Sequence, residues 1–251
     1  ILNLIFSFAQ FVAPSFSVLT GLGQSISEVS ASTIPTYEVP AGYAFSIWFV
    51  IFTLAVVDAV RHGLPSSVPQ TERPASHALA SASLYALSTL WMVIAQLNPD
   101  SAWLVVIIIA MWLLALGLFF RQLQQPEPST WVERRVSRPL FGLYSGWLTL
   151  AVFLNFSALV KEAALAAYGV SPTGYALLIL TPGILTGLYI LVKSQGNTWY
   201  GSTLLWALAG IMVTNSVVFV NPVVFSLALL ASVAVGLILW NTHKTSPQRS
   251  A

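Results

Sequence analysis

Eight long apolar stretches dominate the sequence and leave little room for a water-soluble fold. A helix needs about 20 mostly apolar residues to cross a membrane, because the hydrocarbon layer is roughly 30 Å thick and each residue adds about 1.5 Å. Stretches of about this length run from Leu2 to Leu22, Gly42 to Val60, Ala75 to Leu97, Ala102 to Phe120, Leu140 to Val160, Thr173 to Val192, Trp199 to Val220 and Val223 to Trp240. The sequence therefore predicts an all-α, polytopic membrane helix bundle with about eight transmembrane helices.

Charged residues are too scarce to cover a water-facing surface. They make up 7% of the 251 residues, whereas a soluble domain carries about 25%. The pI of about 9.0 rests on a net charge of only +2 without a basic stripe, so no nucleic-acid partner is expected. The chain has no Cys, which excludes disulfides and thiolate chemistry.

The few basic residues fall mainly on one side of the predicted spans. Nine of the ten Lys and Arg residues lie on that side, and only Lys161 lies on the other. The nine are Arg61, Arg73, Arg121, Arg134, Arg135, Arg138, Lys193, Lys244 and Arg249. Because basic loops stay in the cytoplasm, this partition predicts that both the N-terminus and the C-terminus are cytoplasmic.

The loop before the fifth span has two interpretations. Thr130 to Glu133 reads as a helix-capping box, which would start a short helix along the lipid headgroups. The alternative is a solvated basic loop that anchors the neighbouring helices.

Ionisable residues avoid the centres of all eight spans. Asp58 lies near the cytoplasmic end of the second span, where Arg61 and His62 follow at helical spacing and predict a local ion pair. Coupled transporters need titrating or coordinating groups at membrane depth, so ion-coupled transport is not expected. Nucleophile triads, paired carboxylates and phosphate-binding loops are also missing, which argues against an enzyme.

The three histidines, His62, His77 and His243, are too scattered in sequence to predict a metal site. The alternative is that one of them is an axial ligand to the metal of a tetrapyrrole.

Aromatic and amide side chains form stripes on two spans. Tyr144, Trp147 and Asn155 share a face of the fifth span, and Tyr43, Trp48 and Phe52 follow similar spacing on the second. An indole or amide in hydrocarbon needs a hydrogen-bond partner, so both stripes should face protein or a pocket. Helix packing and a ligand pocket both satisfy this requirement, and the residues alone leave the choice open.

Two segments resemble a known family. Residues 40–52 read P-A-G-Y-A-F-S-I-W-F-V-I-F and residues 144–155 read Y-S-G-W-L-T-L-A-V-F-L-N. Both are similar to the best-marked segments of the tryptophan-rich sensory protein (TspO) family, also called the translocator-protein or peripheral benzodiazepine receptor family. Family members usually have five spans, so the resemblance covers residues 1–160, and residues 161–251 add three transmembrane helices and a short cytoplasmic tail.

The resemblance implies a pocket that opens toward the loop between the first two spans. It would bind a porphyrin, haem or chlorophyll-type tetrapyrrole, or a sterol-like lipid, with no cofactor required. The matching ligand-binding residues are Trp48, Trp147, Tyr144, Asn155, Tyr43 and Phe52. Phe52 stands where a Tyr is common in the family. Slow tryptophan-dependent breakdown of a porphyrin is the one catalytic alternative.

The longer, eight-span bacterial proteins of this family are the nearer likeness, and they imply a bacterial inner or thylakoid-type membrane. Pro172 to Ile179 repeats five of eight positions of Pro40 to Ile47. We interpret this echo as a trace of a four-plus-four duplication, with convergence on a helix-entrance signature as the alternative.

Two functions follow. The first is a sensor or carrier for a hydrophobic small molecule, working as a homodimer among membrane lipids. The second is an accessory subunit of a larger membrane complex, for example a pigment-containing one. Gly183 and Gly187 form a G-x-x-x-G pattern that would suit the second function, because it offers a close-packing face to a partner.

Overall fold

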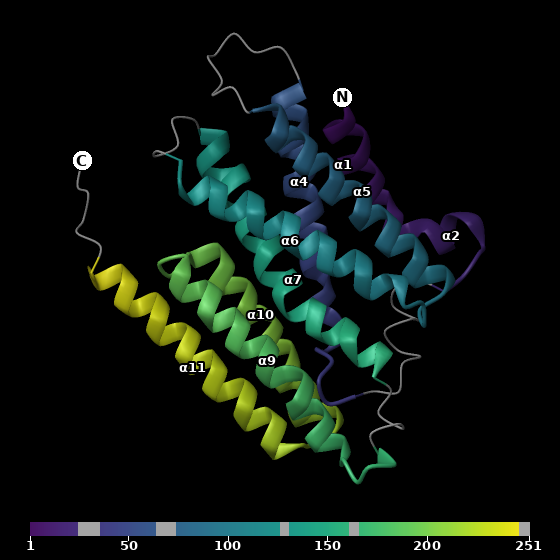
Figure 1. Ribbon diagram of the computed structural model, residues 1–251, viewed down its shortest axis with the longest axis vertical. Helices are drawn as coiled ribbons and strands as arrows, with labels where there is room; N and C mark the ends of the chain where they lie inside the picture. The colour runs from purple at the N-terminus through teal and green to yellow at the C-terminus, as the bar shows by residue number, and fades with distance from the viewer. Residues whose placement is uncertain (25–35, 64–73, 126–130, 161–165, 246–251) are drawn as a thin grey trace.

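A computed structural model describes residues 1–24, 36–63, 74–125, 131–160 and 166–245 (Figure 1). Eight helices in these residues are long and apolar enough to cross a membrane, which confirms the predicted all-α polytopic bundle. The elements are α1 (Leu2–Val12), η1 (Ala13–Ser15), α2 (Phe16–Thr20), η2 (Gly42–Ser46), α4 (Ile47–Gly63), α5 (Ala75–Leu97), α6 (Trp103–Leu123), η3 (Glu133–Ser137), α7 (Arg138–Leu159), α9 (Pro172–Lys193), α10 (Thr198–Val213), η4 (Thr214–Val218) and α11 (Pro222–Thr245).

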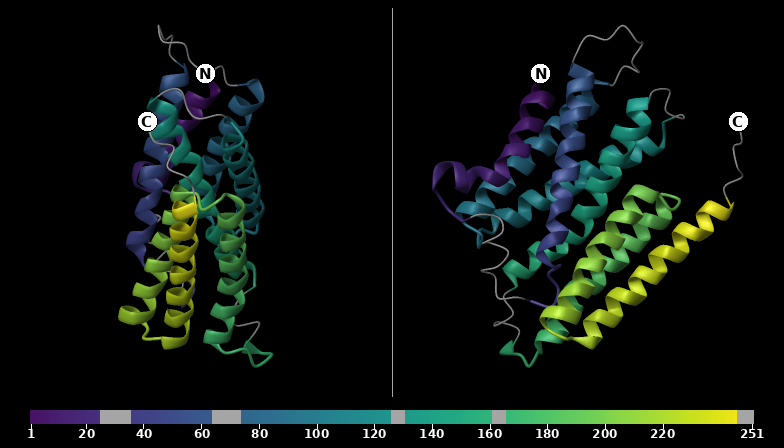
Figure 2. Two further views of the ribbon diagram at one scale, coloured as in Figure 1. Left: turned by 90° about the vertical axis from the view of Figure 1, so that its left-hand side faces the viewer. Right: turned by 180° about the vertical axis from the view of Figure 1, so that it is seen from behind.

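The helices form two rings that share α7. The first ring runs α1, α4, α7, α6, α5 and back to α1, and the second runs α7, α9, α11, α10 and back to α7. Figures 1 and 2 show α9, α10 and α11 lying together on one side of α7. Because α7 packs on both sides, it is the most buried of the eight spans.

The first span bends where its proline interrupts the helix. Pro14 lies in the 3-10 turn η1, and α2 leaves at an angle to α1 (Figure 2). Gln96 of α5 pairs with the backbone at this bend, donating to the carbonyl of Ala13 (2.8 Å) and accepting from the amide of Ser17 (3.0 Å). A broken helix is tolerated at membrane depth when a neighbour satisfies its backbone in this way.

The fifth span starts earlier than hydropathy predicts, at Glu133 rather than Leu140. The span begins with a π-helical turn, η3, which continues directly into α7. The interpretation of this stretch as a solvated basic loop is therefore wrong, and so is that of a separate headgroup helix. The first residue of the predicted capping box, Thr130, lies outside the described residues. The helix continues because this turn packs against α4.

Ser137 of η3 shows how that packing works, because its hydroxyl donates to the carboxylate of Asp58 on α4. Asp58 also lies 3.6 Å from Nδ1 of His62, which confirms the predicted local pairing of these two residues. Asp58 is only 3% exposed, however, so its side chain is buried between α4 and η3 and does not extend to water.

The glycine pair of α9 packs inside the chain. A Cβ on Gly183 would lie 3.1 Å from the ring of Phe153 on α7, and one on Gly187 would lie 3.2 Å from the side chain of Leu204 on α10. The interpretation of this G-x-x-x-G as a face for another protein is therefore wrong. The small residues are used to bring the helices of the second ring together.

Candidate functional site

Four of the six predicted site residues meet between α4 and α7. The indole of Trp48 lies edge-on to the rings of Trp147 (centroids 6.1 Å apart) and Tyr144 (5.9 Å), and it tilts against Phe52 at 5.1 Å. Phe45 of η2 also lies edge-on to Trp147, with ring centroids 5.7 Å apart. We call Trp48, Phe52, Tyr144, Trp147 and Phe45 the aromatic cluster.

A polar edge borders this cluster on the side of α1 and α5. The hydroxyl of Tyr144 donates to Oε1 of Gln10 at 3.1 Å, and the hydroxyl of Ser88 lies beside it. All three side chains are fully buried. Among the described residues, the amide nitrogen of Gln10 has no hydrogen-bond partner. Buried polar groups are rarely left in this state, so the edge offers a donor to a bound molecule.

Sequence reasoning missed Gln10 and Ser88 as site residues. The available signal was an amide in the middle of a mostly apolar first span, which reads equally well as a weakness of that span. Only the packing of α1 against α4 and α5 shows that Gln10 turns inward.

The other two predicted site residues lie apart from the cluster. Asn155 is two helical turns beyond Trp147, where its Oδ1 accepts from the indole of Trp91 on α5 at 3.3 Å. Tyr43 is 45% exposed and lies edge-on to Trp206 of α10, with centroids 5.4 Å apart. Their roles toward a ligand therefore stay predictions.

The family model of TSPO-like proteins matches residues 1–240 of the sequence. The chain belongs to the TSPO-like family. The match covers both rings, so α9, α10 and α11 are part of the family pattern and not an unrelated addition. No curated protein and no solved structure gives a significant match.

The two segments that resemble the family meet at the aromatic cluster, which makes the cluster the candidate site of this family member. Residues 40–52 supply Phe45, Trp48 and Phe52, and residues 144–155 supply Tyr144 and Trp147. The edge-on contact between Trp48 and Trp147 leaves no gap for a planar ring between them. A flat ligand at this place in the TSPO-like chain must therefore displace at least one ring.

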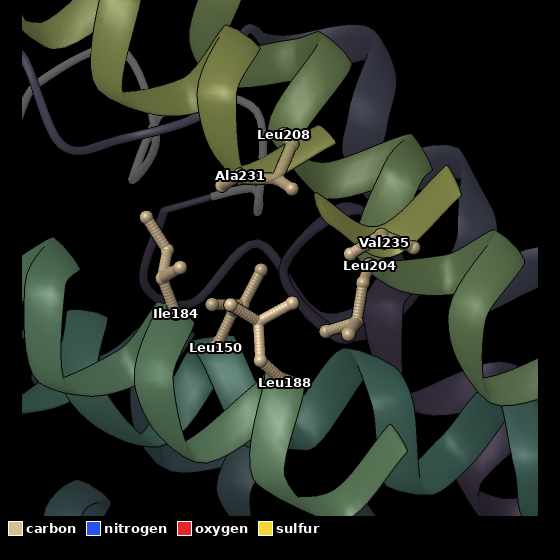
Figure 3. Close-up of a pocket in the computed structure, with 7 residues that line it drawn as sticks. All are labelled: Leu150, Ile184, Leu188, Leu204, Leu208, Ala231 and Val235. Carbon is tan, nitrogen blue, oxygen red and sulfur yellow. The ribbon is translucent and has the colours of Figure 1, made fainter. Parts of the chain in front are cut away.

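A second feature, an apolar pocket, lies at the centre of the second ring. Figure 3 shows seven aliphatic side chains converging on it from four helices: Leu150, Ile184, Leu188, Leu204, Leu208, Ala231 and Val235. Its cavity volume is about 10 Å³, about enough for one water molecule, and all seven of these side chains are apolar. Pockets for small molecules usually measure about 300–1,000 Å³ and carry a few polar groups, so this one is a packing void rather than a tetrapyrrole site.

The titratable side chains of the described residues do not gather into a metal-binding group of three or more. His77 is buried and lies edge-on to the ring of Phe141 at 5.5 Å. His62 contacts Asp58 at the far end of α4. These two histidines thus belong to separate packing contacts.

Proposed function

We propose that this TSPO-like protein binds a flat apolar ligand at the aromatic cluster and acts as a sensor or carrier for it. A porphyrin or related tetrapyrrole is the preferred ligand, and a sterol-like lipid is the alternative. The observation that carries the proposal is that two buried indoles, Trp48 and Trp147, lie edge-on to each other in a cluster bordered by Gln10, whose amide nitrogen has no hydrogen-bond partner among the described residues. Stacking surface and a single buried donor are what an amphiphilic macrocycle needs.

The proposal is binding rather than turnover. The cluster and its polar edge consist of aromatic, amide and hydroxyl side chains, none of which is a carboxylate or imidazole able to act as general acid or base at neutral pH. The proposal also needs no resident cofactor. The rival function, an accessory subunit, loses its one supporting feature because Gly183 and Gly187 pack within the chain.

Titration with protoporphyrin IX, followed by the absorbance of the porphyrin, tests the proposal. We expect saturable binding to the wild type and about tenfold weaker binding to the double variant Trp48→Phe/Trp147→Phe. Each aromatic contact contributes about 0.5–1.5 kcal/mol, and 1.4 kcal/mol corresponds to about tenfold in affinity. The matched control is Trp103→Phe/Trp240→Phe, because both of these indoles are more than half exposed at span ends.

Two results would contradict the proposal. Equal affinity in the cluster variant and the control would mean that the ligand binds elsewhere. Absence of saturable binding to the wild type, together with a stoichiometric membrane complex in native purification, would favour the accessory role.

We further propose that both ends of the chain face the cytoplasm, and the absence of cysteine makes this directly testable. Gln125 and Ala167 are exposed in loops on opposite sides of the predicted topology. In intact cells a membrane-impermeant maleimide should label Ala167→Cys, and it should label Gln125→Cys only after permeabilisation. The reverse pattern would invert the orientation derived from the nine basic residues.

A further inference from the structure

We infer that α10 and η4, from the second ring, position the segment 36–46 that leads into the second span, and thereby control access to the aromatic cluster of the first ring. The segment comprises residues 36–41 and the 3-10 helix η2. Its link to ligand access rests on the function proposed above. Its link to α10 rests on contacts alone.

Four hydrogen bonds join this segment to α10 and η4. Three side chains of the second ring donate to carbonyl oxygens of the segment, and one amide of the segment donates back. They are Asn215 Nδ2 to Tyr37 O (2.8 Å), Thr214 Oγ1 to Val39 O (2.9 Å), Trp206 Nε1 to Ala44 O (2.9 Å) and Ala41 N to Gly210 O (3.0 Å). A turn and a short 3-10 helix leave these backbone groups without partners inside the segment, so α10 and η4 supply the partners that a longer helix or a sheet would supply.

Shape supports the same contact. A Cβ on Gly210 would lie 2.8 Å from Cβ of Pro40 and 2.9 Å from Cβ of Ala44, so the segment lies directly on the backbone of α10. Two edge-on aromatic pairs add to the contact between the segment and the second ring. Tyr37 meets Phe219 at 5.5 Å, and Tyr43 meets Trp206 at 5.4 Å.

The contact of the segment with α10 affects the aromatic cluster because η2 touches both α10 and α7. Tyr43 contacts Trp206 of α10, while Phe45, two residues later, contacts Trp147 of α7. A ligand that separates Phe45 from Trp147 must move η2, and the four hydrogen bonds oppose that movement. Four residues that hydrogen-bond to the segment are thus positioning residues for the proposed site, and none of them belongs to the cluster. They are Trp206, Gly210, Thr214 and Asn215.

Hydrogen exchange of the detergent-solubilised full chain tests the inference, because the amide of Ala41 is itself one of the four donors. In Thr214→Val/Asn215→Leu we expect exchange across residues 39–46 to be at least about tenfold faster, since two of the bonds are lost. Gly210→Ala should produce the same change by pushing the segment away without removing any donor. The matched control is Ser216→Ala, because Ser216 is exposed in the same π-helical turn and its hydroxyl bonds to the carbonyl of Val213.

The outcomes separate the inference from the proposed function. Unchanged exchange in both variants, or equally increased exchange throughout α6 and α7, would overturn local positioning. The association rate of protoporphyrin IX should rise about threefold or more in the same variants and stay close to the wild-type value in the conservative variant Thr214→Ser, which keeps the hydroxyl donor. Faster exchange with an unchanged association rate would overturn control of access, whereas failure of the wild type to bind porphyrin would overturn the proposed function and leave the exchange result to decide the positioning.

Discussion

Replacing Gly146 with alanine is expected to destabilise the protein strongly, because the new methyl group has nowhere to go. A Cβ at this position of α7 would lie 2.8 Å from the carbonyl oxygen of Tyr200 and 2.9 Å from Cβ of Thr203, both on α10. The carbonyl belongs to a helix backbone, so the helices themselves must move apart. Overpacking of this kind costs about 1–3 kcal/mol, and Gly146→Val should cost more.

Gly117→Ala is the matched control, since Gly117 also lies inside a helix, α6, and a Cβ there would meet no atom within 4 Å. Alanine is favoured over glycine within a helix by about 0.5–1 kcal/mol, so the control should be neutral or slightly stabilising. Unfolding in mixed micelles with increasing SDS measures both variants. If Gly146→Ala were as stable as Gly117→Ala, the close approach of α7 and α10 would be wrong.

The positions of the spans could be predicted from the sequence because the bilayer imposes a single length scale. Helix-stopping residues at 98–100, 196–197 and 221–222 separate the same helices in the structure. The ends were less predictable where packing, not hydropathy, decides them. Glu133 begins the fifth span although it is charged, because the turn that it starts packs against α4.

The candidate site could be predicted only in part, for a related reason. Helical periodicity places Tyr144, Trp147 and Asn155 on one face of α7, but a helix rises about 1.5 Å per residue, so Asn155 lies about 12 Å from Trp147 along the axis. Periodicity also gives no information on which helix lies opposite. Gln10 and Ser88 lie at the site because α1 and α5 place them beside Tyr144 of α7. Tyr43 lies outside the cluster because it packs against Trp206 of α10.

The shared helix α7 explains why the two rings act as one structure. Tyr144 and Trp147 face the first ring, while Gly142 and Gly146 face α10 of the second. The resemblance of residues 1–160 to five-span proteins predicted a division at the end of α7. Contacts of α7 with α9 and α10 show how the residues on either side of that division pack together.

Thr149 joins three helices at this seam through a single oxygen. Its Oγ1 accepts from the indole of Trp112 on α6 (2.9 Å) and from the hydroxyl of Tyr200 on α10 (2.9 Å), and it donates to the carbonyl of Ser145 (2.8 Å). Thr149 and Tyr200 are fully buried. The oxygen therefore has its full complement of partners in a place that water does not reach.

Thr149→Val is expected to lower the free energy of unfolding by about 2 kcal/mol, because valine keeps the shape and removes the acceptor that two donors share. An unsatisfied buried donor costs about 1–3 kcal/mol, and measured hydrogen bonds between membrane helices average about 0.6 kcal/mol and reach about 1.7 kcal/mol. Thr149→Ser should retain most of the stability. SDS-induced unfolding provides the measurement.

A double-mutant cycle separates this loss from a simple change in packing. Tyr200→Phe removes one of the two stranded donors, so in the Thr149→Val background it should cost less than in the wild type, where it breaks an existing bond. The ring of Tyr200, stacked on Phe119 with centroids 5.7 Å apart, is retained as phenylalanine in either background. Equal costs of Tyr200→Phe in both backgrounds would show that the hydroxyl does not depend on Thr149, and the junction between the two rings would then rest on shape alone.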